Sequence, residues 1–329
     1  MTRDELLEPF DRLLEDSCPP SVARAIEAGG SSTALWTLID ASGFLDALVP
    51  EDAGGAGLSL ADAAPLLMAL GRHAVPLPVG ETMIARALIA GKRSEQPSGP
   101  VLLVPEHCSA PIPMARAAGD ALVQFGDHYI LAPLAQAELV PASTSDPLTA
   151  ILRWPARLKG PSFPASRDLR ELAAIVASAA IAGAAGRLLE MTIAYANDRT
   201  QFGKPIARQQ AVQQQMAVMA EQVIAARMAA EIGCRAGISG GRAAAATAKC
   251  RASAAALVVA DIAHAIHGAI GISEESDVQL YSRRLREWRL AGGSEGYWAS
   301  ELGRLRLAAP ALSSVNFVRR HITDTDMAA

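Results

Sequence analysis

The sequence predicts a mainly α-helical protein with a small β-rich segment in its middle. Apolar residues recur at helical spacing over long stretches at both ends of the chain. Short β-prone runs, separated by Pro, Gly and Ser, lie between them. Half of the 329 residues are apolar, which is enough for a large buried core. Since strands and helices do not alternate, a doubly wound nucleotide-binding fold is not expected.

Residues 1–97 are predicted to form a helical N-terminal domain. Its first segment places Leu6, Phe10 and Leu14 at helical spacing with acidic residues between them, which indicates an amphipathic helix and not a signal peptide. The glycine-rich segment Val49–Gly57 follows a helical stretch. A dinucleotide-binding loop follows a buried strand, so we interpret this segment as an ordinary loop.

Residues 98–166 are predicted to form a reduced β-rich middle domain, and residues 167–329 a helical bundle. The β-prone runs are VLLVPEH, ALVQFGDHYILAPL and TAILRWPARL. The four long helical segments of the bundle lie near residues 169–198, 208–237, 242–268 and 276–290. Four long helices with short connections are typical of an antiparallel four-helix bundle.

The charge and cysteine content exclude several classes of function. A formal net charge of -4 gives no positive field that would attract nucleic acid or an anionic membrane. Arg, Lys, Glu or Asp interrupt the alanine-rich segments, so we expect no stretch long enough to cross a bilayer. The four cysteines have no partner at metal-ligand spacing, so no metal site is expected. These features favour a cytoplasmic protein.

The most specific motif is the segment Tyr195–Ile206, with the sequence YANDRTQFGKPI. Its Gly203 permits a tight turn, and Arg199 offers a fork of donors that suits a diphosphate. An Arg at a helix C-terminus also complements the helix dipole without any ligand, and for Arg199 alone that alternative stays open. The segment resembles the signature of the acyl-CoA dehydrogenase family. A second segment, Ile266–Gly271, resembles the glycine-rich motif of the same family.

The resemblance implies an FAD-dependent enzyme that desaturates an acyl-CoA between its α and β carbons. It implies that the FAD-binding end of one subunit's bundle contacts the adenine half of the FAD bound in a neighbouring subunit. It also implies a fold of a helical N-terminal domain, a middle β-domain and a C-terminal four-helix bundle. The residues that would contact FAD are Arg199, Phe202, Gln210, Gln213, Gly268 and Gly271.

The chain departs from the family at the catalytic base, a glutamate that removes the α-proton. The position after the fourth bundle helix is Gly292, and the alternative position early in the first bundle helix is Ala173. Neither residue can accept a proton. Glu295 and Glu171 are weak substitutes, because both are out of register; we expect Glu171 to be a solvated first-turn acid and Glu295 to cap a helix together with Ser294.

The middle domain is also short and lacks the family's Thr-Glu-Pro and Trp-Ile-Thr segments. In both departures the chain resembles shortened subunits of bacterial heteromeric acyl-CoA dehydrogenases that act on steroid side chains. The resemblance implies an α2β2 complex in which a second such subunit supplies the base. It also implies an acyl-CoA substrate, for which a steroid CoA thioester is one candidate, and an electron-transfer partner. Two alternatives stay open. One is a self-sufficient homo-oligomer using Glu171 or Glu295, and the other is a flavin-free scaffold.

Overall fold

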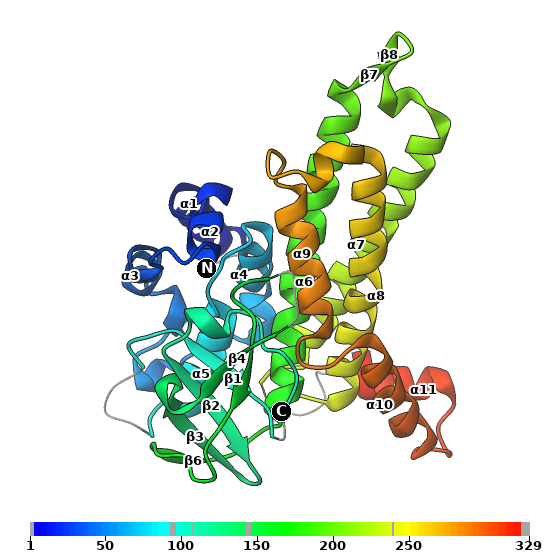
Figure 1. Ribbon diagram of the computed structural model, residues 1–329. Helices are drawn as coiled ribbons and strands as arrows, with labels where there is room; N and C mark the ends of the chain where they lie inside the picture. The colour runs from blue at the N-terminus through cyan, green and yellow to red at the C-terminus, as the bar shows by residue number, and fades with distance from the viewer. Residues whose placement is uncertain (1–2, 93–96, 107, 143–145, 239, 324–329) are drawn as a thin grey trace.

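The computed structural model describes residues 3–92, 97–106, 108–142, 146–238 and 240–323. Helices occupy the described chain up to Ile89, strands follow, and helices resume at Leu169. Figure 1 shows the small sheet beside the N-terminal helices at one end of a long helical bundle. This order confirms the predicted fold class, while the domain boundaries at residues 97 and 166 stay predictions.

The N-terminal region consists of short helices packed on one another. They are α1 (Arg3–Ser17), α2 (Pro20–Glu27), α3 (Thr33–Ala41), α4 (Leu60–Arg72) and α5 (Val79–Ile89). Phe10 and Leu14 of α1 are fully buried, as the amphipathic pattern predicts. Segment 49–57 is a loop with one short 3-10 turn, and it leads into α4. Ser59 begins α4 as a side-chain cap, since its hydroxyl accepts a hydrogen bond from the Asp62 amide.

The middle region contains two small sheets. The first has the order β1-β2-β3-β6, with β1 parallel to β2 and the other pairs antiparallel. The second pairs β4 with β5. The strands are β1 (Val101–Val104), β2 (Asp120–Phe125), β3 (His128–Pro133), β4 (Glu138–Pro141), β5 (Ala150–Arg153) and β6 (Ser162–Pro164). The predicted β-prone runs account for β1, β2, β3 and β5, whereas β4 and β6 are short and were not expected.

The bundle contains the four long helices at the predicted places. They are α6 (Leu169–Asp198), α7 (Gln210–Arg235), α8 (Arg242–His267) and α9 (Val278–Leu290). A hairpin of β7 (Thr200–Gln201) and β8 (Lys204–Pro205) joins α6 to α7, and α10 (Glu295–Leu307) and α11 (Ser314–Val318) follow the bundle. The hairpin forms the tip of the bundle, at the opposite end of α6 from the small sheet (Figure 1).

Two segments of the bundle are long and apolar enough to cross a membrane, by length and composition only. The expectation that no segment would have this length and composition is therefore wrong. They are α6 and the segment Arg242–Ile272. In the folded chain 67% of the apolar window of α6 and 44% of that of the second segment are buried. A helix packed on several sides within a bundle is apolar around most of its circumference, and this explains the composition.

Helices α4 and α6 approach each other so closely that two glycines form the contact. A Cβ atom added to Gly183 of α6 would lie 1.8 Å from the carbonyl oxygen of Met68, and one added to Gly71 of α4 would lie 1.9 Å from that of Ala180. Both distances are far below a van der Waals contact. The main chains of the two helices therefore touch, and this contact fixes the N-terminal helices against the bundle.

We expect Gly183→Ala to lower the free energy of unfolding by at least about 2 kcal/mol, because the added methyl group forces the helices apart. Gly186→Ala is the matched control on the same helix, since an added Cβ there meets nothing within 4 Å. The control should gain up to about 1 kcal/mol from helix propensity. Chemical denaturation of both variants measures the difference, and equal effects would contradict the close contact.

Candidate active site

An apolar cavity lies where α4, α5, β1, α6 and the end of α9 meet. Helix α6 contributes one face to it, because Ala173, Val176, Ala177 and Ala180 are spaced as neighbours on a helical surface. The other walls come from α4 (Leu67, Leu70), the next connection (Val75, Leu77), α5 (Gly80, Glu81), β1 (Leu102, Leu103), the following segment (Pro105, Cys108, Ala110–Met114), Arg170, and the end of α9 with its turn (Trp288, Ala291–Gly293). An enclosed apolar space of this kind suits the hydrocarbon part of a ligand.

The two positions expected for a catalytic base both line this cavity. They are neighbours, since a Cβ atom added to Gly292 would lie 3.3 Å from the carbonyl carbon of Ala173. The same added atom would lie 3.0 Å from the amide nitrogen of Ala174, and Gly292 has a φ of 65°. That conformation is costly for any residue other than glycine. The backbone at Gly292 is thus shaped for a residue without a side chain.

Lys249 of α8 holds the turn that carries Gly292. Its ammonium group donates hydrogen bonds to the main-chain carbonyls of Trp288 (2.8 Å) and Arg289 (2.7 Å) and to the hydroxyl of Ser253 (2.8 Å). The two carbonyls belong to the last turn of α9, where helix carbonyls lack internal partners. Burial lowers the pKa of Lys249 to about 7, and the negative charge of Glu295 acts in the opposite direction. Three acceptors match the three N–H groups of a protonated lysine.

Glu171 is in the first turn of α6, as expected, but the expectation that it is solvated is wrong. It is 7% exposed, and its carboxylate is paired with Arg167 at 2.7 Å and with Arg242 at 3.1 Å. It is not among the residues that line the cavity. Its carboxylate therefore serves as the partner of two guanidinium groups, apart from the cavity.

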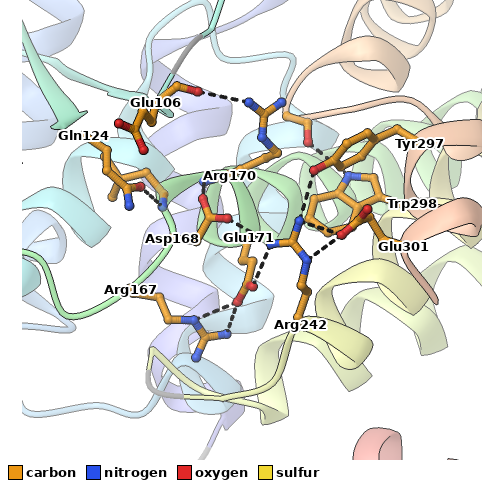
Figure 2. Close-up of polar contacts among 12 residues, drawn as sticks. Glu106, Gln124, Arg167, Asp168, Arg170, Glu171, Arg242, Tyr297, Trp298 and Glu301 are labelled. Carbon is orange, nitrogen blue, oxygen red and sulfur yellow. Dashed lines mark hydrogen bonds and ion pairs between the residues drawn. The ribbon is translucent and has the colours of Figure 1, made fainter. Parts of the chain in front are cut away.

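Arg242, the first residue of α8, is the centre of this ionic network (Figure 2). Its guanidinium donates hydrogen bonds to Asp168 (2.9 Å), Glu171 (3.1 Å), Glu301 (2.8 Å) and the Tyr297 hydroxyl (3.0 Å). Burial acts to lower the pKa of Arg242, but the hydrogen bonds to the three carboxylates outweigh it and raise this pKa. The network joins the starts of α6 and α8 to α10 and so has a structural role.

Glu295 is also engaged outside the cavity. Its carboxylate accepts a hydrogen bond from Nε of Arg289 at 3.0 Å, and the two side chains form an ion pair. Burial acts to raise the pKa of Glu295, but the hydrogen bond from Arg289 and its charge outweigh it, so the pKa is lowered. Only the Ser294 part of the predicted cap is found: its hydroxyl accepts from the Tyr297 amide, whereas the Glu295 carboxylate pairs with Arg289. Neither weak substitute for the base therefore reaches the cavity.

One carboxyl group in the cavity was missed from the sequence. Glu81, near the start of α5, lines the cavity, where the other titratable side chains among the lining residues are those of Arg170 and Cys108. Burial in this apolar space raises the pKa of Glu81 to about 7, while a hydrogen bond with its own backbone acts weakly in the opposite direction. The helical pattern of α5 did not indicate that Glu81 lines a cavity, because such a pattern does not show which residues face a cavity.

The residues expected to contact FAD gather at the far end of the bundle. Arg199 ends α6, Phe202 is in the β7–β8 hairpin with 92% of its surface exposed, and Gln210 begins α7. The side-chain amide of Gln213 donates to the carbonyl of Ala207 at 2.9 Å. Among the described residues no side-chain partner is recorded for Arg199.

The glycine-rich segment lies beside this group. Gly268 ends α8 with a φ of 63°, and an added Cβ there would meet nothing within 4 Å. Gly271 packs closely against His267, since a Cβ atom added to Gly271 would lie 2.9 Å from the Cβ atom of His267. The rings of His267 and Tyr195 stack with centroids 4.3 Å apart, and this contact joins the ends of α6 and α8. The structure therefore brings the two sequence motifs together.

The motif and the cavity are at opposite ends of α6. Ala173 and Arg199 are 26 residues apart along this continuous helix, which separates them by about 39 Å at the helical rise per residue. The residues of the motif consequently cannot reach the cavity of their own chain.

Comparison with known proteins agrees with this architecture. The N-terminal domain of acyl-CoA dehydrogenases matches residues 2–95, and the C-terminal domain matches residues 170–304. The chain belongs to the acyl-CoA dehydrogenase family. Acyl-CoA dehydrogenase IpdE2 of Mycobacterium tuberculosis is 32% identical over 302 residues, a match that covers 86% of this chain and 90% of that relative.

Two solved structures share the fold at lower identity. A variant of the Tcur3481-Tcur3483 steroid ACAD has a TM-score of 0.76 at 22% identity, covering 94% of this chain and 99% of that one. The ChsE4-ChsE5 complex from Mycobacterium tuberculosis has a TM-score of 0.73 at 20% identity, covering 93% and 97%. The family consists of FAD-dependent oxidoreductases.

We expect Lys249→Met to lower the free energy of unfolding by about 2 kcal/mol, because two buried carbonyls of α9 lose their donor. Lys92→Met is the matched control, since Lys92 donates to the carbonyl of Leu88 near the end of α5 but is exposed. The control should change stability by less than about 0.5 kcal/mol. Denaturant titration near neutral pH compares the variants, and similar losses would refute a special role for Lys249.

The stability contributed by Glu81 should depend on pH. Its carboxyl stays neutral in the folded chain up to about pH 7, whereas its ordinary pKa is 4.5. Between these two pH values the folded state holds a proton that the unfolded state releases. The wild type should therefore lose about 1.4 kcal/mol of stability per pH unit relative to Glu81→Gln over this range. Glu81→Leu should behave like Glu81→Gln, and parallel pH curves for all three proteins would contradict the expectation.

Proposed function

We propose that the chain is the subunit without a catalytic base in a heteromeric FAD-dependent acyl-CoA dehydrogenase. A second acyl-CoA dehydrogenase-like subunit supplies the base, and the two assemble as α2β2 in the cytoplasm. The observation that carries the proposal is that Gly292 and Ala173 meet in one cavity and neither can accept a proton. The backbone at Gly292 would be strained by a glutamate, and Glu171 and Glu295 are held in ion pairs elsewhere.

The exposed end of the bundle supports cofactor sharing. Arg199, Gln210 and the ring of Phe202 together suit a diphosphate and an adjoining aromatic group, and the open space at Gly268 admits close approach. Because this end is about 39 Å from the chain's own cavity along α6, a ligand held there belongs to a neighbouring subunit's site. A bound FAD would supply the acceptor for the hydride from the β-carbon of the acyl-CoA, and its reoxidation would need an electron-transfer partner.

The surface of α7 supports assembly with a partner. Residues 209–220 contain no charged side chain, although most of this stretch is exposed or half-buried in the single chain. Further along α7, Ile224 and Met228 are each 59% exposed. Uncharged and apolar helix surface of this kind is typical of a subunit interface. The ChsE4-ChsE5 structure, which has the same fold, is a complex.

The substrate proposed is an acyl-CoA, with a steroid CoA thioester as the first to test. The cavity is lined mainly by apolar side chains, as an acyl group requires. The fold is also that of a structure described as a steroid ACAD.

Arg199→Met should weaken binding of FAD to the purified complex by about tenfold or more, because it removes charge-assisted hydrogen bonds. Flavin occupancy measured by absorbance during dialysis reports the change. Arg235→Met, at the other end of α7, is the control and should leave occupancy unchanged, since Arg235 is exposed and pairs with Glu231 at 3.6 Å.

Thermal unfolding of the lone chain should be alike for both variants, which separates loss of binding from loss of folding. Full flavin occupancy in the Arg199→Met complex would contradict the proposed cofactor site. A colourless complex with the wild-type chain would favour the scaffold alternative.

A further inference from the structure

Glu81 lies on the inner wall of the cavity. The residue before it, Gly80, faces Val176, Leu67 and Leu70, since a Cβ added to Gly80 would lie within 3.6 Å of each of these side chains. Leu67 is 1% exposed and Leu70 7% exposed, whereas Glu81 itself is half-buried.

The opposite part of the cavity is open. Arg170, Ala173 and Gly292 are half-buried, and Ala110 is exposed. Under the proposed function, a thioester bound with its reacting carbons near Gly292 and Ala173 has its distal carbons in the remainder of the cavity, which Glu81 also lines.

A carboxyl group among apolar walls requires a polar partner. Glu81 has desolvated surroundings, and its carboxyl forms a hydrogen bond with its own backbone. Its side chain is half-buried and lines the cavity. Burying a carboxyl in such a site costs free energy, and a further hydrogen bond with a ligand offsets part of this cost. In its neutral form the carboxyl can donate to a keto oxygen, and in either form it can accept from a hydroxyl.

We infer that Glu81 binds a hydroxyl or keto oxygen on the distal part of the acyl group, so that this cavity selects acyl-CoA thioesters that carry such an oxygen. The inference rests on the proposed function, which makes an acyl-CoA the ligand of the cavity. It assigns Glu81 to specificity, because the residue lies on α5 and not at the turn of Gly292.

The test compares matched pairs of ligands on the purified complex. Hexanoyl-, octanoyl- and decanoyl-CoA are each titrated beside their ω-hydroxy and (ω−1)-keto counterparts, and calorimetry gives the dissociation constants. The wild type should bind the oxygenated member of at least one pair about tenfold or more tightly. Glu81→Leu should abolish or reverse this preference. Glu81→Gln, which keeps a donor and an acceptor, should retain part of it. Arg235→Met, which changes an exposed residue of α7 outside the cavity lining, is the control and should leave the preference intact.

Three results would overturn the inference. The first is an unchanged preference in Glu81→Leu, and the second is a wild type that binds both members of every pair equally. The third is a Glu81→Gln variant with unchanged affinities but abolished turnover, which would make Glu81 the proton acceptor. If no acyl-CoA of any kind binds a flavin-containing complex, the proposed function itself fails, and this outcome is distinct from the other three.

Discussion

The rest of the structure depends on the length and burial of α6. This continuous helix of 30 residues carries the cavity at its first turns and ends at the proposed cofactor motif. Its contact with α4 through Gly71 and Gly183 fixes the N-terminal helices beside the cavity. A continuous helix cannot bring its two ends together, so the motif at one end cannot reach the cavity at the other. The proposal that subunits share a cofactor rests on this single constraint.

The turn after α9 shows that the missing base is a feature of the backbone and not of one side chain alone. Gly292 has a conformation that favours glycine, and it is pressed against the start of α6. Lys249 fixes the preceding helix end with buried hydrogen bonds. A glutamate could return to this position only if the turn also moved. The cavity has nevertheless kept one carboxyl, that of Glu81, in an apolar wall that suits binding.

The fold class and the four bundle helices could be predicted from the sequence, because helical spacing of apolar residues reports burial directly. Gly292 and Ala173 were named through the resemblance to the family, but their meeting in one cavity was not predicted from the sequence. Burial of Glu171 could not be predicted, since its partner Arg242 lies 71 residues away and is brought near by packing of α8. Glu81 was missed for the same reason: its surroundings come from α4, β1 and α6, and no local pattern in α5 records them.

The most direct test of the shared cofactor site is the visible absorption spectrum of the chain purified alone and again after co-expression with an acyl-CoA dehydrogenase-like partner encoded beside it. The account predicts a flavin spectrum in the co-purified complex and none in the lone chain, since one chain holds only part of each site. A strong flavin spectrum in the lone chain would contradict it and would indicate a self-sufficient homo-oligomer.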